Sequence, residues 1–287
     1  QYTSLSRQLN PSDIEDEEIW KIIFSDRWVL FQSLHKIFIY DTQQQRFKII
    51  SAAHHLPKIF KVGEHIYFQK MKEGLFKLVN GEEVLVTDHP LFREHILINL
   101  FPKKEHFLFV TQDKGIYEGT PTQIEAWKVS AYQLINTLNI YSCERLSDSS
   151  LVLGTIAKGV YRISAKGELL EHLQQKEGLQ NNTVLSIFED KEHNVWLGLD
   201  NGISMVNFFS PFRLYKDYEG QLGAVYTSIV HQGTLYLGTN QGLFYTPFPL
   251  HSNSKFSLVE GTNGQVWQLK VVENTLFCGH NSGTFII

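Results

Sequence analysis

The segment VLSIFEDKEHNVWLGLDNGISMVN, residues 184–207, decides the fold. It contains an apolar stretch, a polar turn at 190–194, a second apolar stretch ending near Gly198, and Gly202 before a third apolar stretch. Short apolar runs bounded by turn residues are typical of strands that are buried on both faces. The segment therefore predicts three antiparallel strands joined by short turns.

The second half of this segment recurs along the chain. The clearest copies are SLVLGTIAKGVYRI (150–163), TLYLGTNQGLFYT (234–246) and TLFCGHNSGTFII (275–287). A glycine precedes the third strand at positions 74, 115, 159, 202, 242 and 283, and Lys36 replaces it in the first copy. A period of about 41 residues with about four short strands per repeat is typical of propeller blades. The sequence therefore predicts an all-β fold, a seven-bladed β-propeller of four-stranded antiparallel blades.

We expect a single propeller domain over residues 1–287. The predicted blades cover approximately 10–51, 52–88, 89–130, 131–173, 174–216, 217–258, and 259–287 together with 1–8. The last repeat stops after its third strand, so we expect the N-terminal segment 1–8 to supply the outer strand of the last blade. Such closure leaves no open edge between the ends of a ring.

Composition excludes several classes of function. The net charge of −4 gives no reason to expect a nucleic-acid partner. No apolar run approaches the length of about 18 residues that crosses a bilayer, so we expect no membrane contact by this segment. No HExxH, Gly-x-Ser-x-Gly, Walker or CxxC motif is present. We therefore expect no catalytic residue, no metal and no cofactor, and a chain that is not an enzyme.

Residues 178–203 resemble the two-component regulator propeller repeat. The matching positions are Gly178, Leu179, Asn182, Val184, Ile187, Glu189, Asp190, Trp196, Gly198 and Gly202. His193 departs from the turn glycine of that pattern, and Leu199 departs from its threonine. The other repeats keep mainly the strand–Gly–strand half.

The resemblance implies a function and a location. Proteins with this repeat are typically periplasmic sensor parts of membrane-anchored, often hybrid, histidine kinases that regulate glycan use. This chain would then be one sensor propeller, located outside the cytoplasm. Its partners would be a carbohydrate or other small-molecule ligand, and adjoining domains of the same receptor or a second protomer.

Candidate ligand-binding residues come from the expected funnel face of the propeller, where the loops into first strands converge with those between second and third strands. Alignment on the glycines gives one position near the start of each first strand: Trp20, Lys58, Asn99, Ser142, Ser186, Tyr226 and Trp267. Aromatic rings among polar groups suit sugars, because apolar ring faces stack while hydroxyl groups find polar partners. The alternative is that these side chains simply pack between blades.

The second set of loops adds further candidates on the same face. They are His35, Lys72, Asp113, Asp200, Asn240 and Asn281. The alternative for each of these is an ordinary exposed turn residue.

These features of the sequence are compatible with three functions, each of which predicts a different surface. The leading one is an extracytoplasmic sensor propeller that responds to a carbohydrate-derived ligand. A protein-interaction or dimerisation scaffold without its own ligand predicts an exposed apolar patch instead. A propeller enzyme, such as a lyase or hydrolase, predicts carboxylates or a His/Arg cluster converging in the channel.

Overall fold

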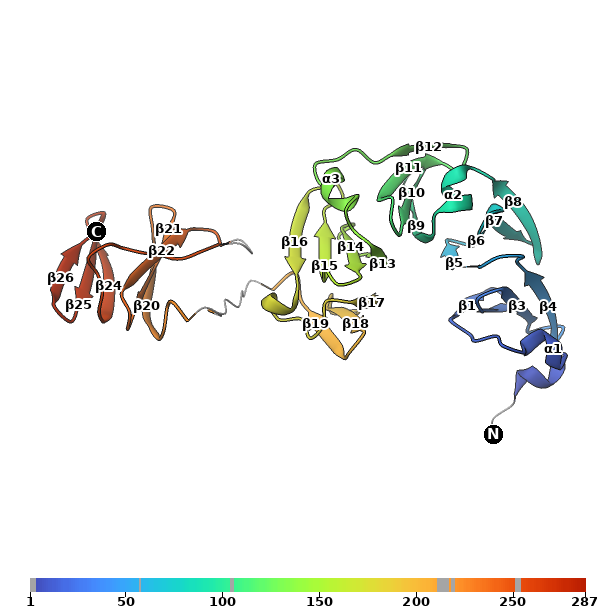
Figure 1. The fold of residues 1–287 in the computed structure, drawn as a ribbon, viewed down its shortest axis with the longest axis horizontal. Coiled ribbons are helices and arrows are strands. Elements are labelled where there is room, and N and C mark those ends of the chain that lie inside the picture. The colour runs from blue at the N-terminus through green and yellow to red at the C-terminus, as the bar shows by residue number, and fades with distance from the viewer. Residues whose placement is uncertain (1–3, 57, 104–105, 211–216, 218–219, 251–253) are drawn as a thin grey trace. The chain divides into compact units, whose positions relative to one another are not determined.

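The computed structural model describes residues 4–56, 58–103, 106–210, 217, 220–250 and 254–287. Within them, seven antiparallel sheets follow one another in chain order, one in each predicted repeat, and we number them sheets 1 to 7 (Figure 1). The prediction of an all-β fold built from seven repeats is confirmed. The chain forms two compact units, unit 1 (Gln1–Phe209) with sheets 1 to 5 and unit 2 (Ser210–Ile287) with sheets 6 and 7.

Among the described residues, unit 1 holds nineteen strands. Sheet 1 comprises β1 (Lys21–Ser25), β2 (Trp28–Gln32), β3 (Lys36–Asp41) and β4 (Arg46–Ser51). Sheet 2 comprises β5 (Ile59–Val62), β6 (His65–Lys70), β7 (Gly74–Val79) and β8 (Glu82–Thr87). Sheet 3 comprises β9 (Leu97–Lys103), β10 (His106–Thr111), β11 (Ile116–Thr120) and β12 (Gln123–Ala126). Sheet 4 comprises β13 (Ile140–Arg145), β14 (Leu151–Thr155), β15 (Val160–Ile163) and β16 (Leu169–Leu173), and sheet 5 comprises β17 (Val184–Glu189), β18 (Val195–Leu199) and β19 (Ile203–Val206).

Short helical turns precede sheet 1 or connect later sheets of unit 1. They are η1 (Leu5–Gln8), α1 (Pro11–Ile14), α2 (Pro90–Glu94), α3 (Tyr132–Ile135) and η2 (Gln175–Glu177). In unit 2, sheet 6 comprises β20 (Val225–His231), β21 (Thr234–Thr239), β22 (Leu243–Pro247) and β23 (Ser257–Leu258), and sheet 7 comprises β24 (Val266–Val272), β25 (Thr275–His280) and β26 (Gly283–Ile286).

The core of unit 1 lies between neighbouring sheets. Leu30 and Phe68 belong to the apolar cluster between sheets 1 and 2, whereas Phe92 and Phe109 belong to the cluster that joins sheets 2 and 3. Further clusters join sheets 3 and 4 and sheets 4 and 5. Because each inner sheet is covered on both faces, its middle strands are near-continuous apolar runs, as the sequence indicates.

The recurring glycine has a steric cause. Gly159 has a φ of +71°, and a Cβ there would collide with the main-chain carbonyl oxygen of Leu173 on the fourth strand. Gly74 has a φ of +140° and faces the Thr87 carbonyl oxygen in the same way. The glycine therefore lets the fourth strand approach the start of the third.

Two details of the prediction differ from the structure. Sheets 5 and 7 have three strands among the described residues, whereas four were expected in each blade. The closing strand expected over residues 1–8 is not confirmed, because Leu5–Gln8 forms a 3-10 turn and residues 1–3 lie outside the described residues. The main-chain amide of Leu9 donates to the carbonyl oxygen of Ser6, a turn that replaces ladder pairing with another strand.

Candidate functional site

The first strands of sheets 4 to 7 each contain a β-bulge, and in sheets 6 and 7 the bulge displaces the predicted column of site residues by one position. In sheets 4 to 7 the residues that face the glycine of the second strand are Ser142, Ser186, Thr227 and Gln268. Tyr226 and Trp267 each lie one residue earlier, at the bulge itself. A bulge adds one unpaired residue, which spacing counted from a distant glycine does not reveal.

The column also shifts by one residue in sheet 1. Lys21 pairs with Gln32, whereas Lys58 lies opposite Gln69, whose main-chain amide donates to the Lys58 carbonyl oxygen. Gln32 and Gln69 are equivalent, because each is buried and hydrogen bonds through its side chain to the main chain that enters the next sheet. Lys21, rather than Trp20, is therefore the counterpart of Lys58. Alignment on the shared Phe-Gln pair at 31–32 and 68–69 would have found it.

The corrected column is polar in every sheet. Its members are Lys21, Lys58, Asn99, Ser142, Ser186, Thr227 and Gln268. In unit 1, four of these side chains donate to main-chain carbonyl oxygens of later sheets. The bonds are Lys21 Nζ to Ile59 O (2.9 Å), Lys58 Nζ to Tyr141 O (3.0 Å), Asn99 Nδ2 to Cys143 O (2.9 Å) and Ser142 Oγ to Val184 O (2.9 Å). The column thus links the first strands to one another.

Beside this column lies an open hollow of about 430 Å³, lined by residues of β1, β5, β9 and β13. Its lining includes Lys21, Phe60, Asn99 and Glu144. Asn99 is a predicted site residue, whereas Lys21 and Glu144 were not recognised from the sequence. The first strands of sheets 1 to 4 thus bring charged groups together around one hollow within unit 1.

Burial perturbs the ionisation of these groups. Desolvation and, to a lesser degree, the nearby Lys21 ammonium lower the pKa of Lys58 to about 8. Desolvation also lowers the pKa of Lys21, although the Glu144 carboxylate partly opposes it. Burial raises the pKa of Glu144, against the favourable effects of the Arg145 main-chain amide and of Lys21. The three shifts share desolvation as their main cause, although the Lys21 side chain is exposed and that of Lys58 is half-buried.

The predicted aromatic residues are accessible. Trp20 is 62% exposed and lies in unit 1, directly before β1. In unit 2, the rings of Tyr226 and Trp267 stack on each other, with centroids 4.8 Å apart and planes at 12°, and both side chains stay about half exposed. The two bulges thus place adjacent aromatic rings on the surface of unit 2.

The second set of loop candidates takes part in local contacts. The Asn240 and Asn281 side chains accept hydrogen bonds from the main-chain amides of Ala224 and Gln265, respectively. Such bonds fix the loop that enters the first strand of the same sheet. The ligand role expected for these two residues therefore competes with a structural one.

The remaining loop candidates lie in unit 1. Asp113 contacts His95 at 3.2 Å, and the ring of His35 lies 5.5 Å from that of His55. The Lys72 main-chain amide donates to the Arg93 carbonyl oxygen, and Arg93 Nε donates to the Lys72 carbonyl oxygen. The Asp200 amide donates to the Thr183 carbonyl oxygen. The side chains of Lys72, Asp113 and Asp200 are exposed.

The motif residues of the repeat at 178–203 serve the scaffold. The Asp190 carboxylate accepts hydrogen bonds from the main-chain amides of Glu192 and Asn194 and from the Trp196 indole N–H at 2.7 Å. These bonds, the Trp196 one foremost, hold the pKa of Asp190 below its usual range. Glu189 accepts from the amide and hydroxyl of Ser147 in the previous sheet. The conspicuous part of the repeat therefore shapes a turn and joins two sheets.

Ser147, Glu189 and His193 also form the arrangement that most resembles a catalytic one. His193 Nδ1 lies 3.0 Å from Ser147 Oγ and 3.1 Å from Glu189 Oε1. In a catalytic triad the acid and the serine contact opposite nitrogens of the imidazole, whereas here both contact the same one. The cluster lacks the geometry of a triad. The described residues contain no group of three His, Cys, Asp or Glu side chains suited to a metal ion.

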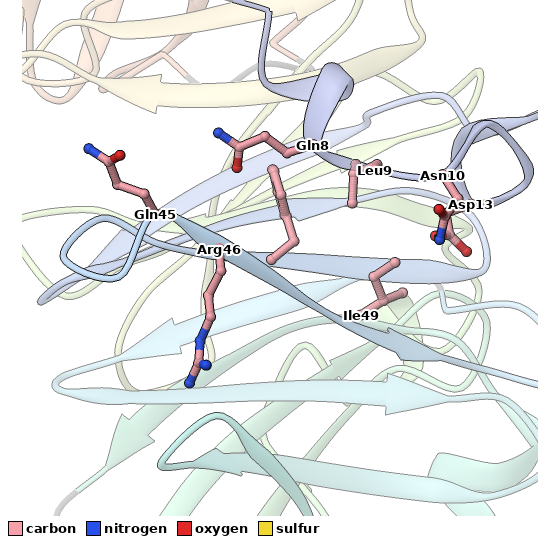
Figure 2. A pocket seen from close by; sticks show the side chains of 8 residues that line it. Gln8, Leu9, Asn10, Asp13, Gln45, Arg46 and Ile49 are labelled. Atoms are coloured by element: carbon pink, nitrogen blue, oxygen red, sulfur yellow. The ribbon is translucent and has the colours of Figure 1, made fainter.

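A second hollow, of about 500 Å³, lies between residues 8–13 and the outer strand β4 (Figure 2). Figure 2 shows the Arg46 side chain pointing away from the amide of Gln8, while Asn10 and Asp13 lie together at the far end. Asn10 Nδ2 donates to Asp13 Oδ2 at 3.1 Å. Because its polar groups do not converge on one point, this hollow is a weaker candidate than the hollow beside Lys21.

Comparisons with known proteins agree with this architecture. Residues 178–201 match the family described as two component regulator propeller. Two crystal structures of the extracellular domain of BT4673 from B. thetaiotaomicron, described as a putative one component system and as a putative hybrid two component system, each reach a TM-score of 0.52. They share 16% and 17% sequence identity with this chain, cover 93% of it, and are matched over 39% of their own length.

At this identity the similarity establishes the fold, and the chain spans about two fifths of the extracellular domain that it matches. A search of curated proteins found no match. Among the described residues, no helix has both the length and the apolar character needed to cross a bilayer.

Proposed function

We propose that this chain, which carries a two-component regulator propeller repeat, is an extracytoplasmic sensor propeller of a two-component signalling receptor. The match of residues 178–201 carries the proposal. The seven repeated sheets and the fold shared with an extracellular domain of such a system support it. The role is binding rather than catalysis, and the receptor is anchored in a membrane through parts that lie elsewhere.

The ligand is a carbohydrate or a carbohydrate derivative. The stacked and half-exposed rings of Tyr226 and Trp267 support this part of the proposal, as does the exposed ring of Trp20. Sugars present apolar C–H faces that pack on aromatic rings, and their hydroxyl groups require polar neighbours. In unit 1, we propose as ligand contacts Trp20, Lys58 and Asn99 together with the loop residues His35, Lys72, Asp113 and Asp200. In unit 2, we propose Tyr226 and Trp267 together with Asn240 and Asn281.

Signalling follows from differential binding. A ligand that binds one arrangement of adjoining domains or protomers more tightly shifts the population toward that arrangement. The bias then passes to a kinase module by thermodynamic linkage. Within unit 1, the hydrogen bonds between sheets hold the first strands in place for such binding.

A thermal-shift screen of the 287-residue chain against a panel of oligosaccharides tests the proposal. A ligand that binds the native state raises the melting temperature by mass action. We expect a dose-dependent rise with one glycan class that is lost in Trp267→Ala or Trp20→Ala. Phe188→Ala removes an aromatic side chain that is 64% exposed on β17 and is the matched control.

The opposite result is equally informative. If no glycan raises the melting temperature at millimolar concentration, the chain is no sugar receptor by itself. A shift that survives in both tryptophan variants would place the sugar away from the proposed aromatic residues.

A further inference from the structure

We infer that unit 2 binds a neutral N-acetylated amino sugar in two equivalent subsites, each made of one aromatic ring and one asparagine. Tyr226 and Asn240 form the first subsite, and Trp267 and Asn281 form the second. In each, the ring packs on the sugar, and the asparagine donates a hydrogen bond to the carbonyl oxygen of the acetamido group. This inference rests on the proposed sensor function and adds the chemical class of the ligand. It concerns residues of unit 2 alone.

The first argument is that the same local arrangement occurs in both sheets of unit 2. In sheet 7 the Asn281 main-chain amide donates to the Gln265 carbonyl oxygen, and Asn281 Oδ1 accepts from the Gln265 amide at 3.1 Å. In sheet 6 Asn240 makes the same two bonds with Ala224, the second at 2.7 Å. Each asparagine is therefore held against the residue that lies two positions before the aromatic ring at the β-bulge.

The second argument is that each asparagine has its oxygen bound and its nitrogen free. A Cβ at Gly223 would collide with Asn240 Oδ1, and one at Gly264 would collide with Asn281 Oδ1, so both oxygens face the main chain of the loop. The nitrogen of each planar carboxamide lies on the other side of Cγ. Within the described part of the chain, neither Nδ2 atom donates to another residue. Each subsite therefore offers N–H donors to a ligand.

The third argument is the accessible surface of the two rings. β20 and β24 are neighbouring strands, and their bulges bring Tyr226 and Trp267 into a stack that covers one face of each ring. The other faces remain accessible, since 44% of Tyr226 and 53% of Trp267 is exposed. The apolar C–H face of a sugar and the methyl group of an acetamido substituent both pack well on such a face.

The fourth argument is the absence of charge. The loops and strand ends that carry both subsites contain no Asp, Glu, Lys or Arg; they are residues 223–228, 239–243, 264–268 and 280–283. The His280 ring is held within its own loop, where Nδ1 accepts from the Ser282 amide at 3.1 Å. An amide carbonyl oxygen only accepts hydrogen bonds, so it matches free N–H donors, whereas a protonated amine could only donate. The subsites therefore suit a neutral acetamido group.

NMR titration of the complete ¹⁵N-labelled chain tests the inference. The probes are N-acetylglucosamine with glucose, N-acetylgalactosamine with galactose, and glucosamine, which carries a free amine. The signals followed are the indole N–H of Trp267, assigned with Trp267→Phe, and the side-chain NH₂ groups of Asn240 and Asn281. We expect an N-acetylated sugar to shift these signals with dose. We expect it to bind about tenfold more tightly than the sugars without an acetamido group.

Aspartate variants separate the ligand role of the asparagines from their structural role. Asn240→Asp and Asn281→Asp keep an oxygen that accepts from the loop amide but have no N–H donor. We expect the double variant to keep its melting temperature and to bind the N-acetylated sugar about tenfold more weakly. Asp200 occupies the equivalent loop position in sheet 5, where its amide donates to the Thr183 carbonyl oxygen. Asn274→Asp makes the same change in the exposed turn between β24 and β25 and should leave the affinity unchanged.

Several outcomes would overturn the inference. Equal binding of each N-acetylated sugar and its parent sugar would reject recognition of the acetamido group and leave the sensor proposal intact. Unchanged affinity in the double aspartate variant would show that the asparagines do not contact the ligand. If the oligosaccharide panel gives a Trp267-dependent shift only with glycans that lack acetamido groups, the inference alone is rejected. If neither the panel nor any probe binds, the sugar-sensing proposal fails with it.

Discussion

The ammonium group of Lys58 donates a 3.0 Å hydrogen bond to the main-chain carbonyl oxygen of Tyr141, which lies two sheets further along the chain. The Lys58 ammonium also lies 5.5 Å from the centre of the Tyr141 ring. A carbonyl oxygen and an aromatic face neutralise a half-buried cation such as Lys58 less well than a carboxylate does. The bond therefore fixes the position of Lys58 and leaves its charge incompletely balanced.

Lys58 should make stability depend on pH in the alkaline range. Its pKa is about 8 in the folded chain and near 10.5 when unfolded, so the unfolded chain binds more protons between these values. The free energy of unfolding should therefore rise as pH increases from about 8 to 10.5. Lys58→Met removes this pH dependence. If the variant is more stable than the wild type at pH 7, the difference between their free energies of unfolding should shrink as pH rises. Urea unfolding at several pH values measures the difference, and a pH-independent difference would contradict the prediction.

Asn99→Ala should destabilise unit 1 by about 1–3 kcal/mol, because it removes the bond to Cys143 O and leaves the Leu100 amide without its acceptor. Ser186→Ala is the matched control, since it changes the same column position in sheet 5, where the side chain is exposed. We expect the control to stay within about 0.5 kcal/mol of the wild type. Denaturant titration compares the two. Equal losses would mean that the inter-sheet bond of Asn99 contributes no stability.

Gln69→Leu should lower the free energy of unfolding more than Asn99→Ala or Ser186→Ala does. The buried Gln69 side chain donates to the carbonyl oxygens of Phe92 and His95 and accepts from the Leu97 amide. Leucine fills a similar volume but leaves three main-chain groups without this partner, so we expect a loss of about 2–5 kcal/mol. Gln43→Leu, in an exposed turn, is the control for an added apolar side chain. Unfolding curves that place both variants within about 0.5 kcal/mol of the wild type would reject this role for Gln69.

Gly159→Ala should destabilise the chain far more than Gly233→Ala. Both glycines have similar positive φ values, +71° and +73°, so both pay the backbone cost of about 1–2 kcal/mol for an L-residue there. A Cβ at Gly159 would also strike the Leu173 carbonyl oxygen, whereas one at Gly233 meets nothing within 4 Å. Melting temperatures of the two variants test the steric account. Equal shifts would indicate that the positive φ alone explains the recurring glycine.

The sequence by itself was sufficient to predict the repeated sheets. Each sheet is built from neighbours in the chain, so short apolar runs, turn residues and a glycine near every third strand define it locally. Local pattern also indicated the repeat at 178–203, whose Asp190 and Trp196 now prove to be joined by a hydrogen bond within one turn. Interactions between residues so close in the chain recur in each repeat, so the spacing of residue types is enough to reveal them.

The tertiary structure decided which side chains meet. The β-bulges shift Tyr226 and Trp267 by one residue relative to Thr227 and Gln268, and a one-residue shift reverses the face on which a side chain lies. Lys21, Lys58 and Glu144 come from three sheets, and their ionisation is perturbed because folding brings these groups near one another and partly desolvates them. Burial and charge proximity are properties of the packed sheets, so no spacing along the chain encodes them directly.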